Sequence, residues 1–190
     1  MKNVIIIGAS GSLAQSVIEK LQKHKDVHLT LLLRNRKRLN NHNSTNAKVV
    51  EGDVMDYPKL KEAINGQDIA YVNLAGNLEA MAKNIVKAMQ ETGVKRIIAI
   101  SSIDIYETPF RSVLQPYRKL ADIIEASGLE YTILRPDWFT NGNEVDYELT
   151  RKGEPEKGTA ISRKSIAAFV AEVINNPEKY CHENFGIARP

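Results

Sequence analysis

Short apolar runs alternate with helical patterns along most of the chain. Six runs are rich in β-branched residues or leucine, at 4–7, 28–33, 48–50, 69–74, 96–100 and 131–134. Because they are nearly continuous rather than alternately apolar and polar, they indicate parallel strands buried on both faces. Helical patterns separate most of them, at 12–23, 57–65, 77–92 and 113–127. This alternation predicts right-handed crossovers and an α/β fold with a doubly wound parallel sheet.

The pattern changes after Pro136. A polar, glycine-containing stretch extends to about residue 160, a last helix is expected at roughly 163–175, and a tail follows. The sequence shows no internal repeat, low-complexity segment or linker. A single domain is therefore expected over the 190 residues.

Composition narrows the class of protein. The chain is 43% hydrophobic and 26% charged, which is typical of a globular protein, and its net charge of +3 is too small to imply nucleic-acid binding. Its one cysteine, Cys181, excludes an internal disulfide framework and offers no metal cluster. No apolar run approaches the roughly 20 residues that span a bilayer, and the first is too short for a secretory signal. We therefore expect a cytoplasmic protein without a metal or a membrane segment.

The strongest local signal is the glycine turn in VIIIGASGSLA, residues 4–14. A strand precedes the turn and a helix follows it, so unpaired amide groups and the helix dipole would favour a phosphate there. Gly8 permits a tight turn, Gly11 lets a pyrophosphate approach the backbone, and Ala14 lets the helix pack closely. The alternative is a tight connection without a ligand. The predicted phosphate-binding residues are Gly8, Ser10, Gly11, Ser12 and Leu13.

A basic corner follows the second expected strand. An NAD site would place Asp or Glu there to accept hydrogen bonds from the ribose. This chain instead has Arg34, twenty positions after Ala14, followed closely by Arg36, Lys37 and Arg38. A guanidinium can bind a 2′-phosphate through two hydrogen bonds, so the corner favours NADP, with NAD as the second choice. A solvated basic turn is the alternative.

Several motifs together resemble one family. The chain is similar to the atypical short-chain dehydrogenase/reductase group with NmrA-like NAD(P)-binding domains, whose small members include flavin and quinone reductases. The matching motifs are GASGSLA at 8–14, Arg34–Asn35, GDVMD at 52–56, NLAG at 73–76, ISS at 100–102, SGLEYTILRP at 127–136 and ISRKSIAAFVAEVI at 161–174. The resemblance implies a Rossmann-like sheet of strand order 3-2-1-4-5-6, with the cofactor across the carboxyl ends of the strands. It also implies one NAD(P)-binding domain over 1–190, in which 136–190 contributes the substrate-side loops and the C-terminal helix.

Further cofactor residues follow from these motifs. Asp53 and Val54 could hold an adenine, although Asp53 could equally be a turn residue. Ala75 and Gly76 leave room for a ribose. The resemblance also implies that Asn35 belongs, with Arg34, to the corner that binds the 2′-phosphate. Ser101 and Ser102 end the fifth strand, where hydroxyl groups face a ligand or only satisfy the backbone. The full cofactor prediction is Gly8, Ser10, Gly11, Ser12, Leu13, Arg34, Asn35, Asp53, Val54, Ala75, Gly76 and Ser101.

The family's Tyr-x-x-x-Lys pair is missing at its expected position. Leu114 and Arg118 stand there instead, and Tyr117 and Lys119 point to nearly opposite sides of a helix. The one literal match, at 57–61, begins the wrong helix. Catalysis through a tyrosine is therefore doubtful.

Reduction of a flavin or a quinone needs a stacked acceptor more than a protein acid. Ser102 and Tyr106 are the catalytic candidates, and Trp138 and Phe139 could form a wall against a planar acceptor or simply pack under the loops. Two hypotheses remain: an NADP-dependent oxidoreductase with a small-molecule substrate, and a non-catalytic NAD(P)-binding redox sensor that acts through a protein partner. A monomer or a homodimer fits either.

Overall fold

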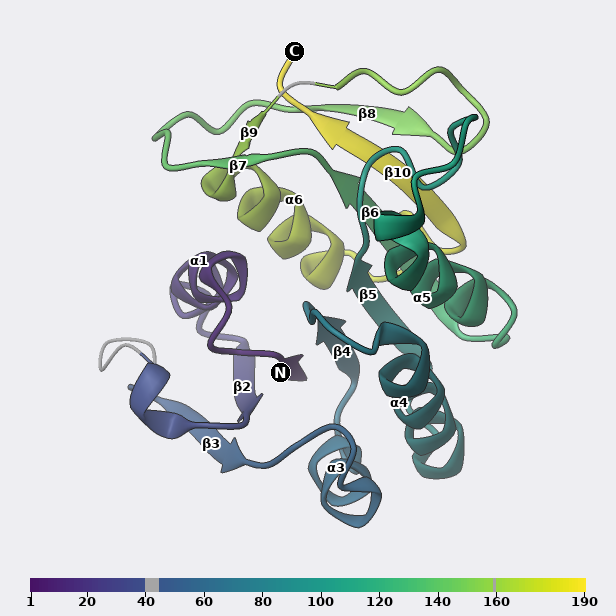
Figure 1. Cartoon of the computed structure of the whole chain (residues 1–190). Helices are drawn as coiled ribbons and strands as arrows, with labels where there is room; N and C mark the ends of the chain where they lie inside the picture. The colour runs from purple at the N-terminus through teal and green to yellow at the C-terminus, as the bar shows by residue number, and fades with distance from the viewer. Residues whose placement is uncertain (40–44, 159) are drawn as a thin grey trace.

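The protein is described here by a computed structural model covering residues 1–39, 45–158 and 160–190 (Figure 1). The strands are β1 (Lys2–Ile7), β2 (Val27–Leu33), β3 (Ala47–Glu51), β4 (Ile69–Val72), β5 (Arg96–Ile100), β6 (Glu130–Pro136), β7 (Phe139–Thr140), β8 (Glu148–Arg151), β9 (Ile161–Ser162) and β10 (Glu183–Ala188). The helices are α1 (Ser12–Leu21), α3 (Tyr57–Ile64), α4 (Leu78–Thr92), α5 (Gln115–Glu125) and α6 (Arg163–Asn175). Short 3-10 turns, η1 (Arg36–Arg38) and η2 (Ser112–Leu114), precede β3 and α5.

Within the described residues, eight strands form one sheet in the order β3-β2-β1-β4-β5-β6-β10-β8. The strands from β3 to β10 pair in parallel, and β8 joins the edge antiparallel to β10. A separate two-residue parallel ladder pairs β7 with β9. The predicted doubly wound, Rossmann-like α/β domain is therefore confirmed, and the first six strands take the expected order 3-2-1-4-5-6.

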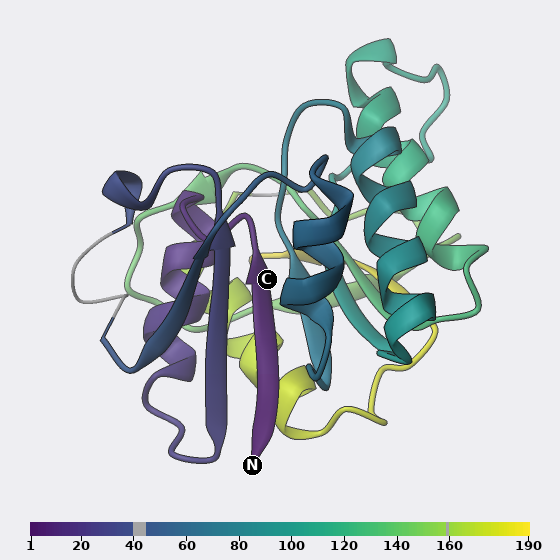
Figure 2. The ribbon, with the colours of Figure 1, turned by 90° about the horizontal axis from the view of Figure 1, so that it is seen from below.

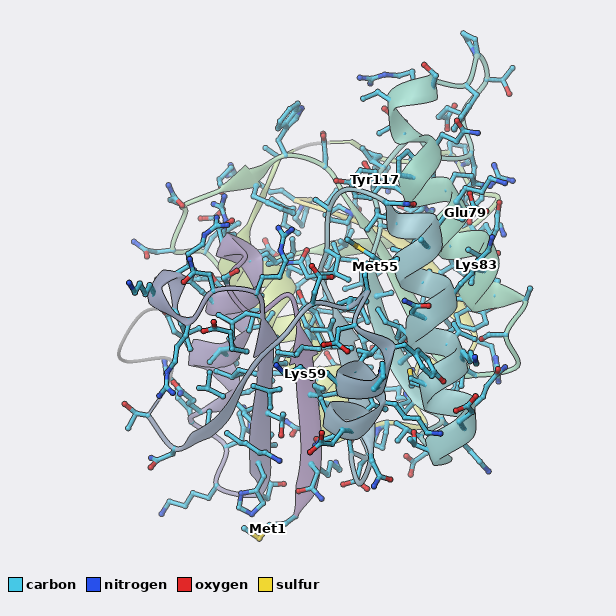
Figure 3. The ribbon with its side chains drawn as sticks, turned by 60° about the horizontal axis from the view of Figure 1, so that its bottom comes forward. Met1, Met55, Lys59, Glu79, Lys83 and Tyr117 are labelled. Atoms are coloured by element: carbon cyan, nitrogen blue, oxygen red, sulfur yellow. The ribbon has the colours of Figure 1, made fainter. Side chains whose placement is uncertain are left out.

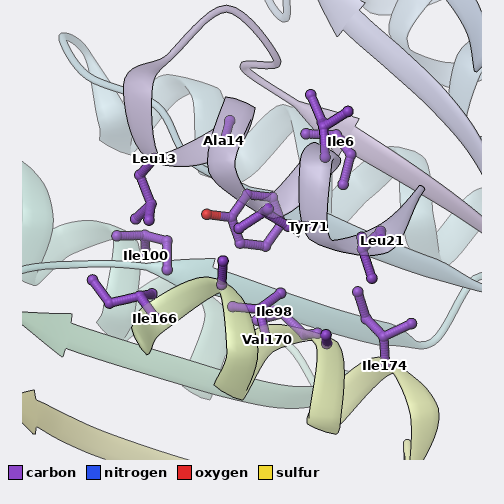
Figure 4. Close-up of a cluster of buried hydrophobic side chains, with 14 of the residues drawn as sticks. Ile6, Leu13, Ala14, Leu21, Tyr71, Ile98, Ile100, Ile166, Val170 and Ile174 are labelled. Atoms are coloured by element: carbon purple, nitrogen blue, oxygen red, sulfur yellow. The ribbon is translucent and has the colours of Figure 1, made fainter. Parts of the chain in front are cut away.

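Helices cover both faces of the sheet. Helices α1 and α6 pack on one face, and α3, α4 and α5 on the other (Figures 1 and 2). Alternate residues of β1 separate accordingly, because Ile6 faces the first group of helices and Ile5 the second, both fully buried. Figure 4 shows the first face, where Leu13 of α1 and Val170 of α6 meet side chains from the sheet. Burial on both faces explains the near-continuous apolar runs.

The expected tail is the main correction to the fold. Residues 183–188 form β10, five of whose six residues are buried, and β8 extends the sheet further. The segment reads ENFGIA, in which two polar residues and a glycine leave too short an apolar run to predict a strand. It becomes a strand because β6 offers an unpaired edge, on which Phe185 lies opposite Leu134.

No described helix combines the length and the apolar character that crossing a membrane would require.

Candidate cofactor-binding cleft

A cleft of about 680 Å³ lies along the carboxyl ends of the parallel strands. Segments that follow six different strands line it: 8 and 10–13 after β1, 32–34 at the end of β2, 52–54 after β3, 73–75 after β4, 100–104 after β5 and 136–139 after β6. The order of the strands reverses between β1 and β4, and ligands of open α/β sheets bind at such a switch point. The volume is within the range of small-molecule sites.

The two glycines of the turn are constrained in different ways. Gly8 has φ +89°, and a Cβ built on it would lie 2.1 Å from the carbonyl oxygen of Asn73, so the chain itself requires glycine. Gly11 has an ordinary extended backbone, with φ −68° and ψ 147°. A Cβ there would make contacts no closer than 3.4 Å, to the oxygen of Gly8. The protein alone therefore has room for a Cβ at Gly11, and a ligand passing over it would use that room.

Helix α1 begins at the cleft without a side-chain cap. Its N-cap is Gly11, its first turn contains no acidic residue, and Ser12 and Leu13 line the cleft. By contrast, the side chains of Asn77 and Ser162 accept hydrogen bonds at the starts of α4 and α6. The free amide groups and positive dipole end of α1 make this the part of the cleft best suited to a phosphate.

The basic corner lies at one end of the cleft, which Arg34 and Arg38 line. Neither arginine forms an ion pair with another described residue. Asn35 is absent from the lining, and its side-chain oxygen instead accepts a hydrogen bond of 3.0 Å from the backbone of Lys37, which caps η1. Asn35 therefore shapes the turn that carries the arginines.

Of the other predicted cofactor residues, Asp53, Val54 and Ala75 line the cleft. A carboxylate oxygen of Asp53 also accepts a hydrogen bond of 2.8 Å from the backbone of Met55, so this residue holds its turn as well. Gly76 is outside the lining. Its φ of +106° lets the chain turn into α4, which is a backbone requirement rather than a ligand contact.

The two predicted serines, Ser101 and Ser102, lie at the other end of the cleft. Ser101 and Ser102 both line it, and the buried hydroxyl of Ser101 donates a 3.0 Å hydrogen bond to the carbonyl oxygen of Tyr117. Ser101 therefore satisfies the backbone. Ser102 is half-buried, and no hydrogen bond of its side chain is found among the described residues.

Tyr106 is not brought to this cleft, which corrects its prediction as a catalytic candidate. It lines an adjoining hollow of about 710 Å³, which shares Asp104 and Arg111 with the cleft, and its hydroxyl accepts a hydrogen bond of 2.9 Å from Asn184. Cations flank the ring, with the guanidinium of Arg118 and the ammonium of Lys152 each 4.5 Å from its centroid. Burial, and then the charge of Glu125, raise the pKa of Tyr106, so the phenol stays protonated at neutral pH. Its displacement follows from β10, on which Asn184 holds it.

Apolar side chains surround the end of the cleft opposite the basic corner, and we call them the apolar mouth. Trp138 is 81% exposed and Val113 is 68% exposed, and Phe139, Leu114 and Tyr117 complete it. Of these residues, Trp138 and Phe139 are predicted from the sequence as a wall of the site. Leu114 and Tyr117 are considered there only as positions of a Tyr-x-x-x-Lys pair, and Val113 is not predicted. The signal was available, because α5 follows β5 and so begins at the carboxyl edge of the sheet; Figure 3 shows Tyr117 there. Met81 was not predicted, Arg38 was predicted only as part of the basic corner, and Asn73 only as part of the NLAG motif.

Among the described residues, no group of three or more His, Cys, Asp or Glu side chains is placed to hold a metal ion.

Comparison with known proteins extends over most of the chain. A family model described as NAD(P)H-binding matches residues 8–177. A Rossmann-fold NAD(P)-binding family protein from Shigella flexneri is 46% identical, with a TM-score of 0.92 over the whole chain and 94% of that structure. A short-chain dehydrogenase/reductase from Veillonella parvula, in complex with NADP, is 26% identical, with a TM-score of 0.90 over the whole chain and 95% of that structure.

Two curated relatives are less similar than the Shigella protein. Phenylcoumaran benzylic ether reductase IRL1 of Ginkgo biloba is 28% identical in an alignment of 181 positions that covers 87% of this chain. This chain spans only 56% of that reductase's length. An uncharacterized sugar epimerase of Bacillus subtilis, YhfK, is also 28% identical, over 86% of this chain and 78% of its own.

Proposed function

The chain belongs to the NAD(P)H-binding family, as its likeness to atypical short-chain dehydrogenases/reductases predicted, and from this premise we propose that it is an NADP-dependent reductase. It transfers a hydride to a small planar acceptor such as a flavin or a quinone. The observation that carries the proposal is the continuity of one cleft, from the basic corner across the uncapped start of α1 to the apolar mouth at Trp138.

The basic corner supports NADP as the cofactor. Arg34 and Arg38 line the end of the cleft beside β2, where an NAD site would carry a carboxylate. A guanidinium without an ion-pair partner is available for two charge-assisted hydrogen bonds to a 2′-phosphate. The Veillonella relative is itself a complex with NADP.

The bound cofactor supplies the hydride, and this chain binds and orients the reactants. The amide groups of α1 and the space above Gly11 would hold the phosphates, and Asp53 and Val54, which line the cleft, would contact the adenine. At the mouth, Trp138 and Phe139 provide aromatic surface for stacking a planar acceptor and keeping water away. Close, stacked approach is the main requirement of this hydride transfer.

At this end Ser102 lines the cleft together with the charged residues Asp104, Arg111 and Asp137, and its hydroxyl is our candidate for orienting the acceptor. Tyr117 lines the cleft, but the residue one helical turn later is Ala121, which is fully buried. The lysine of a Tyr-x-x-x-Lys pair is therefore missing from its face of α5.

Steady-state NADPH oxidation with panels of flavins and quinones tests the proposal. Turnover is expected with at least one acceptor, and Trp138→Ala should raise the KM for that acceptor more than it changes the affinity for NADPH. Val145→Ala is the matched control, because Val145 is 59% exposed but outside the cleft lining. NADPH binding without turnover across both panels would contradict reductase activity and favour the non-catalytic redox sensor.

A further inference from the structure

Arg163, the first residue of α6, reaches across to the start of α1. Its Nε donates a hydrogen bond of 3.1 Å to the hydroxyl oxygen of Ser12, which is 151 residues away in the sequence. Its Nη1 donates to the carbonyl oxygen of Thr140 at 3.1 Å and to the side-chain oxygen of Asn141 at 2.9 Å. The guanidinium also lies 5.3 Å from the ring centroid of Phe139. Arg163 itself is outside the lining of the cofactor cleft, but two of its contacts, Ser12 and Phe139, line it.

The charge of Arg163 is not neutralised within the described part of the chain, where it forms no ion pair. Its position is electrostatically unfavourable, because the first turns of α1 and α6 both present the positive end of a helix dipole. A guanidinium has five N–H donors, and the three hydrogen bonds above use Nε and Nη1. The two donors of Nη2 have no partner among the described residues.

The hydrogen bond from Arg163 leaves the hydroxyl of Ser12 free to act as a second donor. Because the oxygen of Ser12 accepts from Arg163, its own hydroxyl hydrogen is available to a ligand in the cleft. A phosphate beside Ser12 would therefore meet the amide groups of α1, the hydroxyl of Ser12 and a fixed cation. An anion there would also remove the repulsion between the guanidinium and the two helix starts.

We propose that Arg163 binds the pyrophosphate of the dinucleotide, together with the start of α1, and holds α6 and β7 against the bound cofactor. This inference rests on the proposed function. It gives the cleft two cations with different tasks. Arg34 recognises the 2′-phosphate that only NADP carries, whereas Arg163 recognises the pyrophosphate that NAD and NADP share.

Calorimetric binding of NADPH, NADH and adenosine 2′-monophosphate separates the two tasks. Arg163→Gln should weaken NADPH and NADH by the same factor, roughly 10- to 100-fold, and leave adenosine 2′-monophosphate, which has no pyrophosphate, within about twofold. Arg34→Ala should do the reverse, weakening NADPH and adenosine 2′-monophosphate but not NADH. Lys164→Gln is the matched control, since the exposed Lys164 contacts Asn143 rather than the cleft, and no change is expected.

A merely structural role for Arg163 would give a different result. If Arg163→Gln weakened all three ligands equally, or left both dinucleotides unchanged, the proposal would be overturned. Arg163→Lys provides a second measurement if the glutamine variant folds poorly, because it keeps the charge but loses the planar set of donors. It should weaken NADPH and NADH equally, and by less than Arg163→Gln does. Unchanged affinity for both dinucleotides would contradict the proposal. If the wild-type protein bound neither dinucleotide, the proposed function would fail first and this inference with it.

Discussion

At the scale of the residue, Gly11 is a position where we expect a substitution to affect ligand binding without affecting folding. Its backbone is ordinary and a Cβ would fit, so Gly11→Val should fold normally and lose NADPH binding, because the branched side chain would occupy the space above the turn. Calorimetry and circular dichroism measure the two effects. In contrast, Gly8→Ala should destabilise the protein by about 1–3 kcal/mol, through its positive φ and the clash with Asn73. Native NADPH affinity in a folded Gly11→Val variant would show that the phosphates lie elsewhere.

Arg34 is the residue expected to select the cofactor. Loss of a charge-assisted contact to the 2′-phosphate should cost about 1.5–3 kcal/mol, or roughly 10- to 100-fold in NADPH affinity, while NADH binding stays unchanged. Lys37→Ala serves as the control, because Lys37 belongs to the same turn but lies outside the cleft lining. Equal weakening of both cofactors by Arg34→Ala, or a wild-type preference for NADH, would leave the corner as a solvated turn.

Tyr117 lines the cleft but is not expected to supply a proton. With Ala121 buried on the same face of α5, no lysine stands one turn later to pair with the Tyr117 hydroxyl. Tyr117→Phe should therefore change turnover by less than about fivefold, whereas loss of a required general acid typically costs about 10²–10⁴. The measurement is steady-state NADPH oxidation with the preferred acceptor. A hundredfold fall with intact cofactor affinity would restore a tyrosine-dependent mechanism.

At the scale of the element, a buried ion pair connects the end of β6 to the segment between β8 and β9, which also accepts a hydrogen bond from the loop after β5. Arg135 of β6 and Glu156 have side chains that are 1% and 7% exposed, and the second carboxylate oxygen of Glu156 accepts a 2.7 Å hydrogen bond from the backbone of Asp104. Glu156→Gln leaves the arginine charge buried and unpaired, which should lower the free energy of unfolding by about 3–5 kcal/mol. Chemical denaturation measures this loss.

The control for that variant is Glu79→Gln, which breaks an exposed pair with Lys83 on α4 (Figure 3). Solvated pairs of this kind contribute at most about 1 kcal/mol, so its effect should be much smaller. Because Asp104 and its neighbours line the cleft, Glu156→Gln should also weaken acceptor binding. Equal effects of the two variants would show that the buried pair does not brace the loop.

At the scale of the whole molecule, the cleft touches the ends of strands from both halves of one sheet. A ligand that binds only the folded protein therefore stabilises the whole domain. NADPH at a hundred times its Kd should add about 2.7 kcal/mol, which corresponds to a rise in Tm of roughly 5–10 °C for a chain of this size. Thermal unfolding at increasing NADPH concentration measures the shift, and Gly11→Val should abolish it. A Tm independent of NADPH would contradict binding at this cleft.

Local patterns in the sequence alone determined the parallel sheet, the glycine turn and the basic corner. A strand buried on both faces must be apolar throughout, and a turn residue with φ +89° favours glycine, so each of these features has its cause in its own segment. The position of Arg34 could be predicted from its segment as well, because the end of the second strand reaches the cleft in this fold.

The tertiary structure alone decided which distant residues meet. Residues 183–188 are a strand because β6 presents a free edge, and β10 then holds Tyr106 away from the cleft through Asn184. Ser12 and Arg163 are 151 residues apart, and they meet only because α1 and α6 pack side by side on one face of the sheet. No local periodicity encodes such contacts, since they depend on how the crossovers bring separate elements together.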